Sequence, residues 1–205
     1  MIKAEGPTPP PMRLEDRQWA GLFLLVGTTQ FAIGMIIAEA VDPSYSVSTN
    51  YISDLGVRAG AVIFNTSIIL LGITILATSW LLLRAFKDPI LMIPVLLAGV
   101  GAVGVGVFTE AFGFLHTIVS FITFLFAGLS AILAFRILRP PLSYVSVFLG
   151  VGSLAALGLF ISNNFLGLGN GGMERMIVYP VLTWGIGFGG YLLGMSHSQG
   201  PPAAT

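Results

Sequence analysis

The residues able to do chemistry in this chain stand at the ends of long apolar stretches, not inside them. No Asp, Glu, Lys or Arg falls in the middle of an expected membrane span, where a charge would mark a proton relay or an ion pathway. A polar side chain that adjoins an apolar run needs a hydrogen-bonding partner, so we expect these residues to meet at one end of the fold. The predicted ligand-binding set is Asp54, Arg58, Asn65, Glu110, His116, Asn163, Glu174, Arg175 and Tyr179.

His116 is the histidine expected within the membrane-embedded part, and it follows Glu110 across a turn at Gly113. Together with Glu110 or Asp54 it could activate water as an acid–base pair, with or without a metal. Metal sites usually show two histidines at helical spacing, which this sequence lacks, so no metal and no cofactor is predicted. A lone histidine at a helix start also serves as a hydrogen-bonded cap, which is the interpretation we favour. Candidate nucleophiles without a flanking elbow motif are Ser53, Ser120 and Ser162.

The charged residues of this set have two interpretations that the sequence leaves open. Arg175 either clamps Glu174, Glu110 or Asp54 for structural reasons, or forms with them the wall of a binding site. Glu39 and Asp42, in contrast, are expected to be ordinary solvated residues of a headgroup surface.

Composition restricts the class of protein. Of the 205 residues, 55% are hydrophobic and 9% charged, whereas a soluble domain carries about 25% charged residues. Nine basic residues balance nine acidic ones, so no excess positive charge would attract nucleic acid. The absence of cysteine excludes disulfides, thiolate metal sites and thiol catalysis.

The uncharged stretches have the length of membrane spans, because a bilayer core of about 30 Å needs about 20 helical residues. We predict an all-α bundle of six transmembrane helices that occupies residues 18–195. It is preceded by a disordered, Pro-rich cytoplasmic arm at 1–17 and followed by a flexible tail at 196–205. The predicted helices are 18–40, 60–84, 89–110, 114–137, 141–162 and 175–195.

The longest connection, residues 42–60, predicts a short interfacial helix. Ser48 can cap a helix that begins at Thr49, and Gly56 can end it. Such a helix would lie on the outer surface, with Asp54 turned toward the other polar residues.

Orientation is predicted from the basic residues. With cytoplasmic N- and C-termini, Arg58 and Arg175 lie outside and the other seven of the nine Lys and Arg residues lie inside, as expected of a multi-pass protein of the cell membrane. The Gly-rich faces of helices 89–110 and 175–195 either pack inside the bundle, which we favour, or join copies into a homo-oligomer.

Three segments carry a family resemblance: 43–65, 106–116 and 172–180. The first contains Pro-Ser-Tyr-Ser, then Asn-Tyr-Ile-Ser-Asp-Leu-Gly, then Ile-Phe-Asn; the second contains Gly-Val-Phe-Thr-Glu and His116. The chain resembles the archaeal and bacterial membrane-protein family catalogued as domain of unknown function 998, although Thr109 stands where that family has Pro. The third segment looks like its archaeal members. The resemblance implies a six-helix membrane fold, no established activity, and signature residues at the outer face.

Three functions follow as hypotheses, and whether the protein is an enzyme stays open. The first is a small bundle that binds a membrane lipid or solute in a polar pocket at the outer leaflet, where residues of both signs would suit a zwitterionic or anionic head group. The second is an intramembrane lipid hydrolase or transferase that uses His116 with Glu110 or Asp54. The third, a small transporter, is disfavoured by the absence of charge at the membrane midplane.

Overall fold

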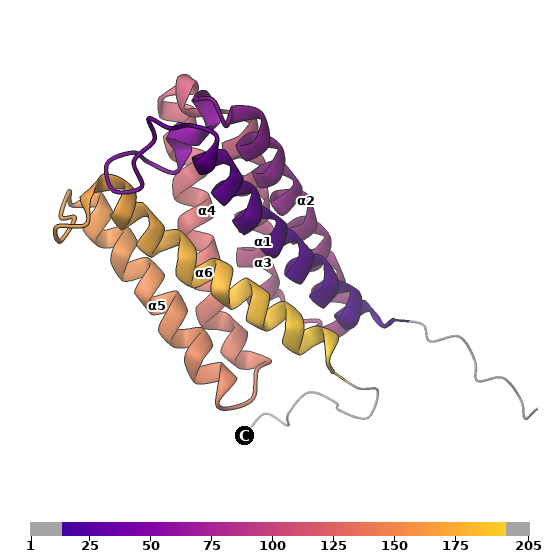
Figure 1. The fold of residues 1–205 in the computed structure, drawn as a ribbon. Helices are drawn as coiled ribbons and strands as arrows, with labels where there is room; N and C mark the ends of the chain where they lie inside the picture. Colours follow the sequence, from indigo (N-terminus) through magenta and orange to yellow (C-terminus); the bar gives the residue numbers. More distant parts are fainter. Residues whose placement is uncertain (1–13, 196–205) are drawn as a thin grey trace, which may run out of the picture.

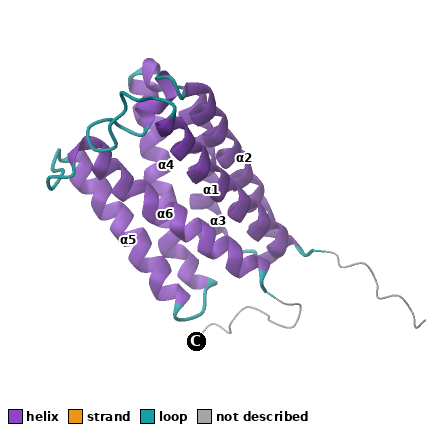
Figure 2. Ribbon diagram, in the orientation of Figure 1, coloured by secondary structure: helices purple, strands orange, loops and turns teal. Residues whose placement is uncertain are grey.

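The computed structural model describes residues 14–195, and within them all regular structure is helical (Figure 2). The prediction of an all-α fold with six spans is confirmed, because six of the described helices are long and apolar enough to cross a membrane. The arm and tail lie outside the described residues, except for residues 14–17. The helices are α1 (Asp16–Ala40), α2 (Ala61–Phe86), α3 (Pro89–Val107), α4 (Phe114–Leu133), α5 (Leu142–Ile161) and α6 (Gly169–Leu193), with 3-10 turns η1 (Ser53–Val57), η2 (Glu110–Phe112) and η3 (Ala134–Arg136).

The helices form a closed ring. Each helix packs against the next one along the chain, and α6 packs against α1. The helix α4 also contacts α6, which leaves α5 toward the outside of the bundle (Figure 1). A ring of helices encloses a central space, and side chains from five of the six helices converge there.

Local sequence signals explain where several helices begin and end. Glu15 and Gln18 form a reciprocal capping box at the start of α1. Asp88 accepts a hydrogen bond from the backbone of Ile90, and Pro89 occupies the first turn of α3. The same short connection ends α2 at Lys87, whose left-handed backbone stops the helix. These signals fix the tight hairpin between α2 and α3.

The two ends of the bundle carry different connections between the helices. At one end, α1 begins and α6 finishes, and the Gln18 amide contacts the carbonyls of Leu193 and Met195 at 3.5 and 3.4 Å. We call the opposite end the polar end; it carries residues 41–60, residues 108–113 and residues 162–168 (Figure 1).

Helix α6 starts six residues earlier than the sequence predicts. The Gly-rich run 167–172 suggested a loop, yet α6 already begins at Gly169. The reason is a close approach of two backbones: a Cβ on Gly171 would lie 1.9 Å from the carbonyl oxygen of Asn50. Glycine at this position lets the 41–60 loop rest directly on α6.

The predicted interfacial helix exists, but its start and its cap differ. The short helix η1 begins at Ser53 rather than Thr49 and has no side-chain cap. Ser48 does not cap it, because its hydroxyl donates to the carbonyl of Leu168 at 2.8 Å. Ile52 and Leu55 are buried against the bundle, so the five-residue helix η1 covers the polar end.

Candidate functional site

An ion pair joins the two ends of the loop 41–60. Arg58 donates to the Asp42 carboxylate at 2.7 Å and also to the hydroxyl of Ser44. The hydrogen bond from Arg58, together with those from Ser44, lowers the pKa of Asp42 to about 2. Asp42 is therefore a paired structural residue, and the expectation that it is simply solvated is wrong.

Arg175 holds the same loop against α1 and α6. Its side chain is buried, with 3% of the residue exposed, and its guanidinium donates to the carboxylate of Glu39 and to the Tyr45 hydroxyl. It also donates to the carbonyl oxygens of Val47 at 2.9 Å and Gly171 at 3.0 Å. The planar guanidinium group, with its five N–H donors, suits acceptors that converge on it from several segments.

This arrangement corrects the predicted partner of Arg175. The ion pair is with Glu39 on α1, not with Glu174, Glu110 or Asp54, and the expectation that Glu39 is merely solvated is wrong. Tyr45 completes the pairing: burial raises its pKa to about 12, so the phenol keeps its proton and donates it to the carbonyl of Tyr51 at 2.8 Å. We call Glu39, Asp42, Tyr45, Arg58 and Arg175 the loop clamp.

A second polar group lies beside the clamp and faces inward. Glu174, which is 5% exposed, accepts a hydrogen bond from the backbone nitrogen of Ile52 at 2.5 Å. Asp54 accepts from the Asn50 amide at 2.9 Å and from the backbone of Tyr51 at 3.0 Å. These contacts orient both carboxylates through the backbone of the η1 region.

Glu110 lies on η2 and shares a hydrogen bond with Asp54. Two carboxyl groups can share such a bond only when one of them carries a proton. Partial burial and the neighbouring Asp54 raise the pKa of Glu110 to about 7. Near neutral pH Glu110 therefore exchanges between its protonated and its ionised form.

His116 and Ser120 form a pair on the first turns of α4. His116 Nδ1 lies 2.7 Å from the carbonyl oxygen of Phe108, and Nε2 lies 3.2 Å from the Ser120 hydroxyl. A carbonyl can only accept, so Nδ1 donates to it, which leaves Nε2 to accept from the Ser120 hydroxyl. His116 does not cap the start of α4, which has no side-chain cap; the ring instead satisfies the carbonyl of Phe108, the residue that follows α3.

Two cavities meet beneath the polar end. The outer one has a volume of about 440 Å³ and lies between the start of α4, the end of α5 and the η1 region. We call it the vestibule, and its polar side chains are Tyr51, Ser53, Glu110, His116, Thr117, Ser120 and Glu174.

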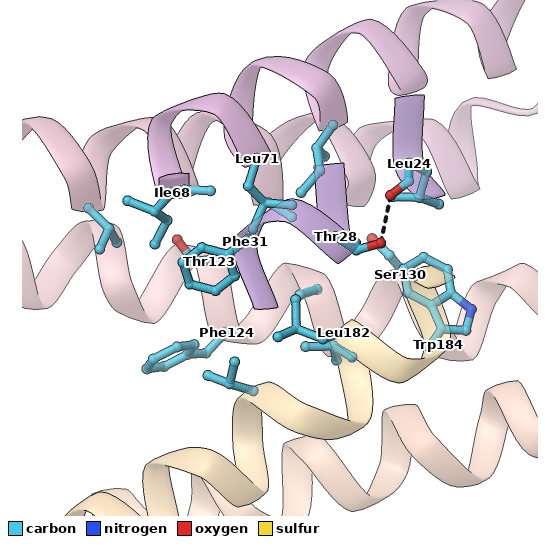
Figure 3. A pocket seen from close by; sticks show the side chains of 18 of the residues that line it. Leu24, Thr28, Phe31, Ile68, Leu71, Thr123, Phe124, Ser130, Leu182 and Trp184 are labelled. Carbon is cyan, nitrogen blue, oxygen red and sulfur yellow. Dashed lines mark hydrogen bonds between the residues drawn. The ribbon is translucent and has the colours of Figure 1, made fainter. Parts of the chain in front are cut away.

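The inner cavity, of about 90 Å³, lies in the middle of the ring and is lined almost entirely by apolar side chains. Phe31, Phe124 and Leu182 surround it, and the Thr28 hydroxyl turns away from it to the carbonyl of Leu24 (Figure 3). Four residues line both cavities and mark their junction: Ser53, Ser120, Phe124 and Glu174.

The structure brings together part of the predicted set. Glu110, His116 and Glu174 line the vestibule, and Asp54 bonds to Glu110 behind it. The other five residues of the set do not line either cavity: Arg58 and Arg175 belong to the clamp, Asn65 donates to the carbonyl of Gly56, Asn163 follows α5, and Tyr179 lies on α6 with 42% of its surface exposed.

The sequence analysis missed Tyr51 and did not join Ser120 to His116. The pairing of Ser120 with His116 was predictable from the sequence, because residues four apart share one face of a helix. Within residues 14–195, no three His, Asp or Glu side chains lie in a group that could hold a metal ion. The hypothesis of His116 working with Glu110 or Asp54 stays a prediction, since the ring contacts Phe108 and Ser120 instead.

The family model described as Protein of unknown function (DUF998) matches residues 25–190. The chain belongs to the DUF998 family. The match covers all six helices in whole or in part, and it covers the lining of both cavities except Leu24, so the fold described here belongs to the DUF998 domain itself. No curated protein and no solved structure matches the chain.

Proposed function

We propose that this DUF998 protein binds a single-chain amphiphile, with the head group in the vestibule and the start of the chain in the inner cavity. The observation that carries the proposal is the junction of a polar and an apolar cavity at Ser53, Ser120, Phe124 and Glu174. Ligand sites combine an apolar lining with a few convergent polar groups. Here the polar groups line the vestibule and the apolar lining belongs to the adjoining inner cavity.

The volumes favour a slender ligand. The vestibule, of about 440 Å³, lies within the range of roughly 300–1,000 Å³ found for small-molecule sites. The inner cavity, of about 90 Å³, is smaller than the roughly 150 Å³ that accommodates benzene in an engineered protein. It therefore admits a short length of one hydrocarbon chain, and a longer chain would leave sideways into the bilayer.

The polar lining favours an uncharged or cationic head group. Glu110 and Glu174 contribute carboxyl groups and Ser53 and Ser120 contribute hydroxyls, whereas among residues 14–195 no lysine or arginine lines either cavity. Arg58 and Arg175, which suggested an anionic head group from the sequence, are occupied by the loop clamp. A head group with hydroxyl or amine donors complements the acceptors that remain.

We further propose that the polar end lies at the outer leaflet of the cell membrane. The bias of Lys and Arg toward the other end of the bundle supports this orientation. The ligand would then come from the outer leaflet, or from the solution outside the cell.

Native mass spectrometry of the protein in detergent tests the binding, with monooleyl glycerol ether as an uncharged ligand and oleoyl lysophosphatidate as an anionic one. We expect the ether to bind at least about tenfold more tightly, because a phosphate beside two carboxyl groups is repelled. Absence of ether binding, or preferential binding of the phosphate, would contradict the proposal.

A matched pair of variants places the ligand. Ala127 lines the inner cavity, and Ala127→Phe fills it, so this variant is expected to bind the ether about tenfold more weakly or worse. Ala155 is exposed on α5, and Ala155→Phe should bind as the unmodified protein does. Equal binding by both variants would show that the chain of the ligand does not enter the ring.

A further inference from the structure

We propose that Ser120 and His116 act as nucleophile and general base in the hydrolysis of a carboxylic ester, the substrate being an uncharged acyl ester of a polyol bound in the vestibule. This inference rests on the proposed binding of an amphiphile and adds a reaction to it. It differs from water activation by His116 with a carboxylate, because the group that His116 contacts is a hydroxyl.

The first observation is the pair of contacts that the two imidazole nitrogens make. The carbonyl oxygen of Phe108, 2.7 Å from Nδ1, fixes the proton on that nitrogen and turns the lone pair of Nε2 to Ser120. In the known serine hydrolases a carboxylate performs this orienting task. Here the carbonyl of Phe108, the residue after α3, performs it. His116 is 7% exposed, so the ring is held in place.

The second observation is that Ser120 differs from the other hydroxyls of the helices. Ser79, Thr123, Ser130 and Ser153 each donate to a backbone carbonyl oxygen, at distances between 2.7 and 3.0 Å, which is how hydroxyls in apolar helices are normally satisfied. Ser120 instead has an imidazole nitrogen as its hydrogen-bond partner, at 3.2 Å. A hydroxyl paired with a neutral base is the arrangement that activates serine.

The third observation is position. Ser120 lines both cavities, so it lies where a bound amphiphile changes from polar head to apolar chain. In an acyl ester of a polyol, the carbonyl carbon stands at that same boundary. Binding therefore brings the reacting carbon to the hydroxyl and gives the reaction its orientation.

The chemical steps balance without a further reactant except water. The Ser120 oxygen attacks the ester carbonyl carbon as His116 Nε2 takes the hydroxyl proton, and the hydroxyl of Ser53 at the junction donates to the oxyanion. The C–O bond to the polyol then breaks, and His116 returns the proton to the departing alkoxide. Water, deprotonated by His116, then attacks the acyl carbon, the bond from that carbon to the Ser120 oxygen breaks, and the fatty acid is released. His116 Nε2 returns the proton to the Ser120 oxygen, which restores both residues.

Two measurements test the reaction on the full chain in proteoliposomes. The first is release of oleate from monoolein, followed by mass spectrometry. The second is covalent labelling by an alkyl fluorophosphonate, mapped by peptide sequencing. We expect oleate release and a label on Ser120, with both lost by roughly 100-fold or more in Ser120→Ala and His116→Gln.

Ser162→Ala is the matched control, because the Ser162 hydroxyl lies at the same end of the bundle but donates to the Leu159 carbonyl; it should keep full release and labelling. Labelling of the unmodified protein needs no variant, so the result stands even where a variant fails to fold. If the ether analogue binds while monoolein stays intact and Ser120 stays unlabelled, the hydrolysis is wrong and the binding stands. If neither molecule binds, the proposed function is wrong as well.

Discussion

The loop clamp and the vestibule lie side by side at the polar end, yet they use polar residues in opposite ways. In the clamp, the charges of Asp42 and Glu39 are matched by arginines at ion-pair distance. In the vestibule, Glu110 faces another carboxyl, and the His116 ring is paired with a hydroxyl on the cavity wall. Charged side chains with an oppositely charged partner indicate a structural role. Polar side chains that line a cavity without such a partner indicate a binding or catalytic site. The comparison can be tested by breaking each region separately.

The largest effect is expected from the clamp. Arg175→Met removes the hydrogen bonds to Glu39, to Tyr45 and to the carbonyls of Val47 and Gly171, and leaves a largely buried carboxylate without a partner. We expect a loss of about 3–5 kcal/mol in the free energy of unfolding, measured by thermal unfolding in detergent.

The matched control for this variant is Arg84→Met. Arg84 pairs with Asp16 at 3.0 Å, but 53% of its side chain is exposed, and an exposed ion pair contributes roughly 0–1 kcal/mol. Equal losses in the two variants would mean that the clamp contributes no more than a surface pair does.

A smaller effect is expected where the loop rests on α6. Gly171→Ala puts a Cβ 1.9 Å from the Asn50 carbonyl oxygen, and since that atom belongs to the backbone, the loop has to move. We expect a loss of about 1–3 kcal/mol and a weaker binding of the ether, because η1 also borders the vestibule.

Gly190→Ala, on the same helix, is the control for this close approach. A Cβ there meets no atom within 4 Å, so the variant should be neutral or more stable by about 0.5–1 kcal/mol through helix propensity. A destabilised Gly190→Ala would point instead to a contact that this face makes with another molecule.

These residues also show how much the sequence could predict. The lengths of the apolar stretches were sufficient to find six helices, because a span is a local property of composition. The partner of Arg175 was not predictable, since it depends on how the 41–60 loop folds across α1 and α6, which no spacing along the chain encodes. The early start of α6 was hidden for the same reason, as Gly171 serves a contact with a distant backbone.

The candidate site was predictable to a similar extent. Glu110, His116 and Glu174 were selected because each adjoins an apolar run, and the structure places them around one cavity. Asn65 and Arg175 were selected on the same grounds and lie elsewhere. Adjacency to an apolar run identifies residues that need partners, but only the packing of α4 against α3 and α5 decides which of them face a shared space.

The smallest effect, and the one that separates the two regions by sign, is the dependence of stability on pH. The pKa of Asp42 is lowered from 3.8 to about 2. The stability that the ionised Asp42 adds to the fold is therefore complete above the ordinary pKa of 3.8 and is lost as the pH falls through about 2. The pKa of Glu110 is raised from 4.5 to about 7. The stability that the protonated Glu110 adds to the fold is therefore complete below the ordinary pKa of 4.5 and is lost as the pH rises through about 7.

Thermal unfolding in detergent between about pH 5 and pH 9 should therefore show a modest decline in the stability of the unmodified protein from about pH 5 to about pH 7, which levels off at higher pH. Glu110→Gln keeps the hydrogen-bonding shape of the protonated acid and cannot ionise, so its decline should be smaller; part of the decline should remain, because the variant leaves the buried carboxyl of Glu174 in the same cavity unchanged. Asp42→Asn should retain the decline, because the group it removes does not titrate in this range. A decline of undiminished size in Glu110→Gln would show that the ionisation of Glu110 is not a source of it, and this side chain would then differ from those of the clamp only in its position.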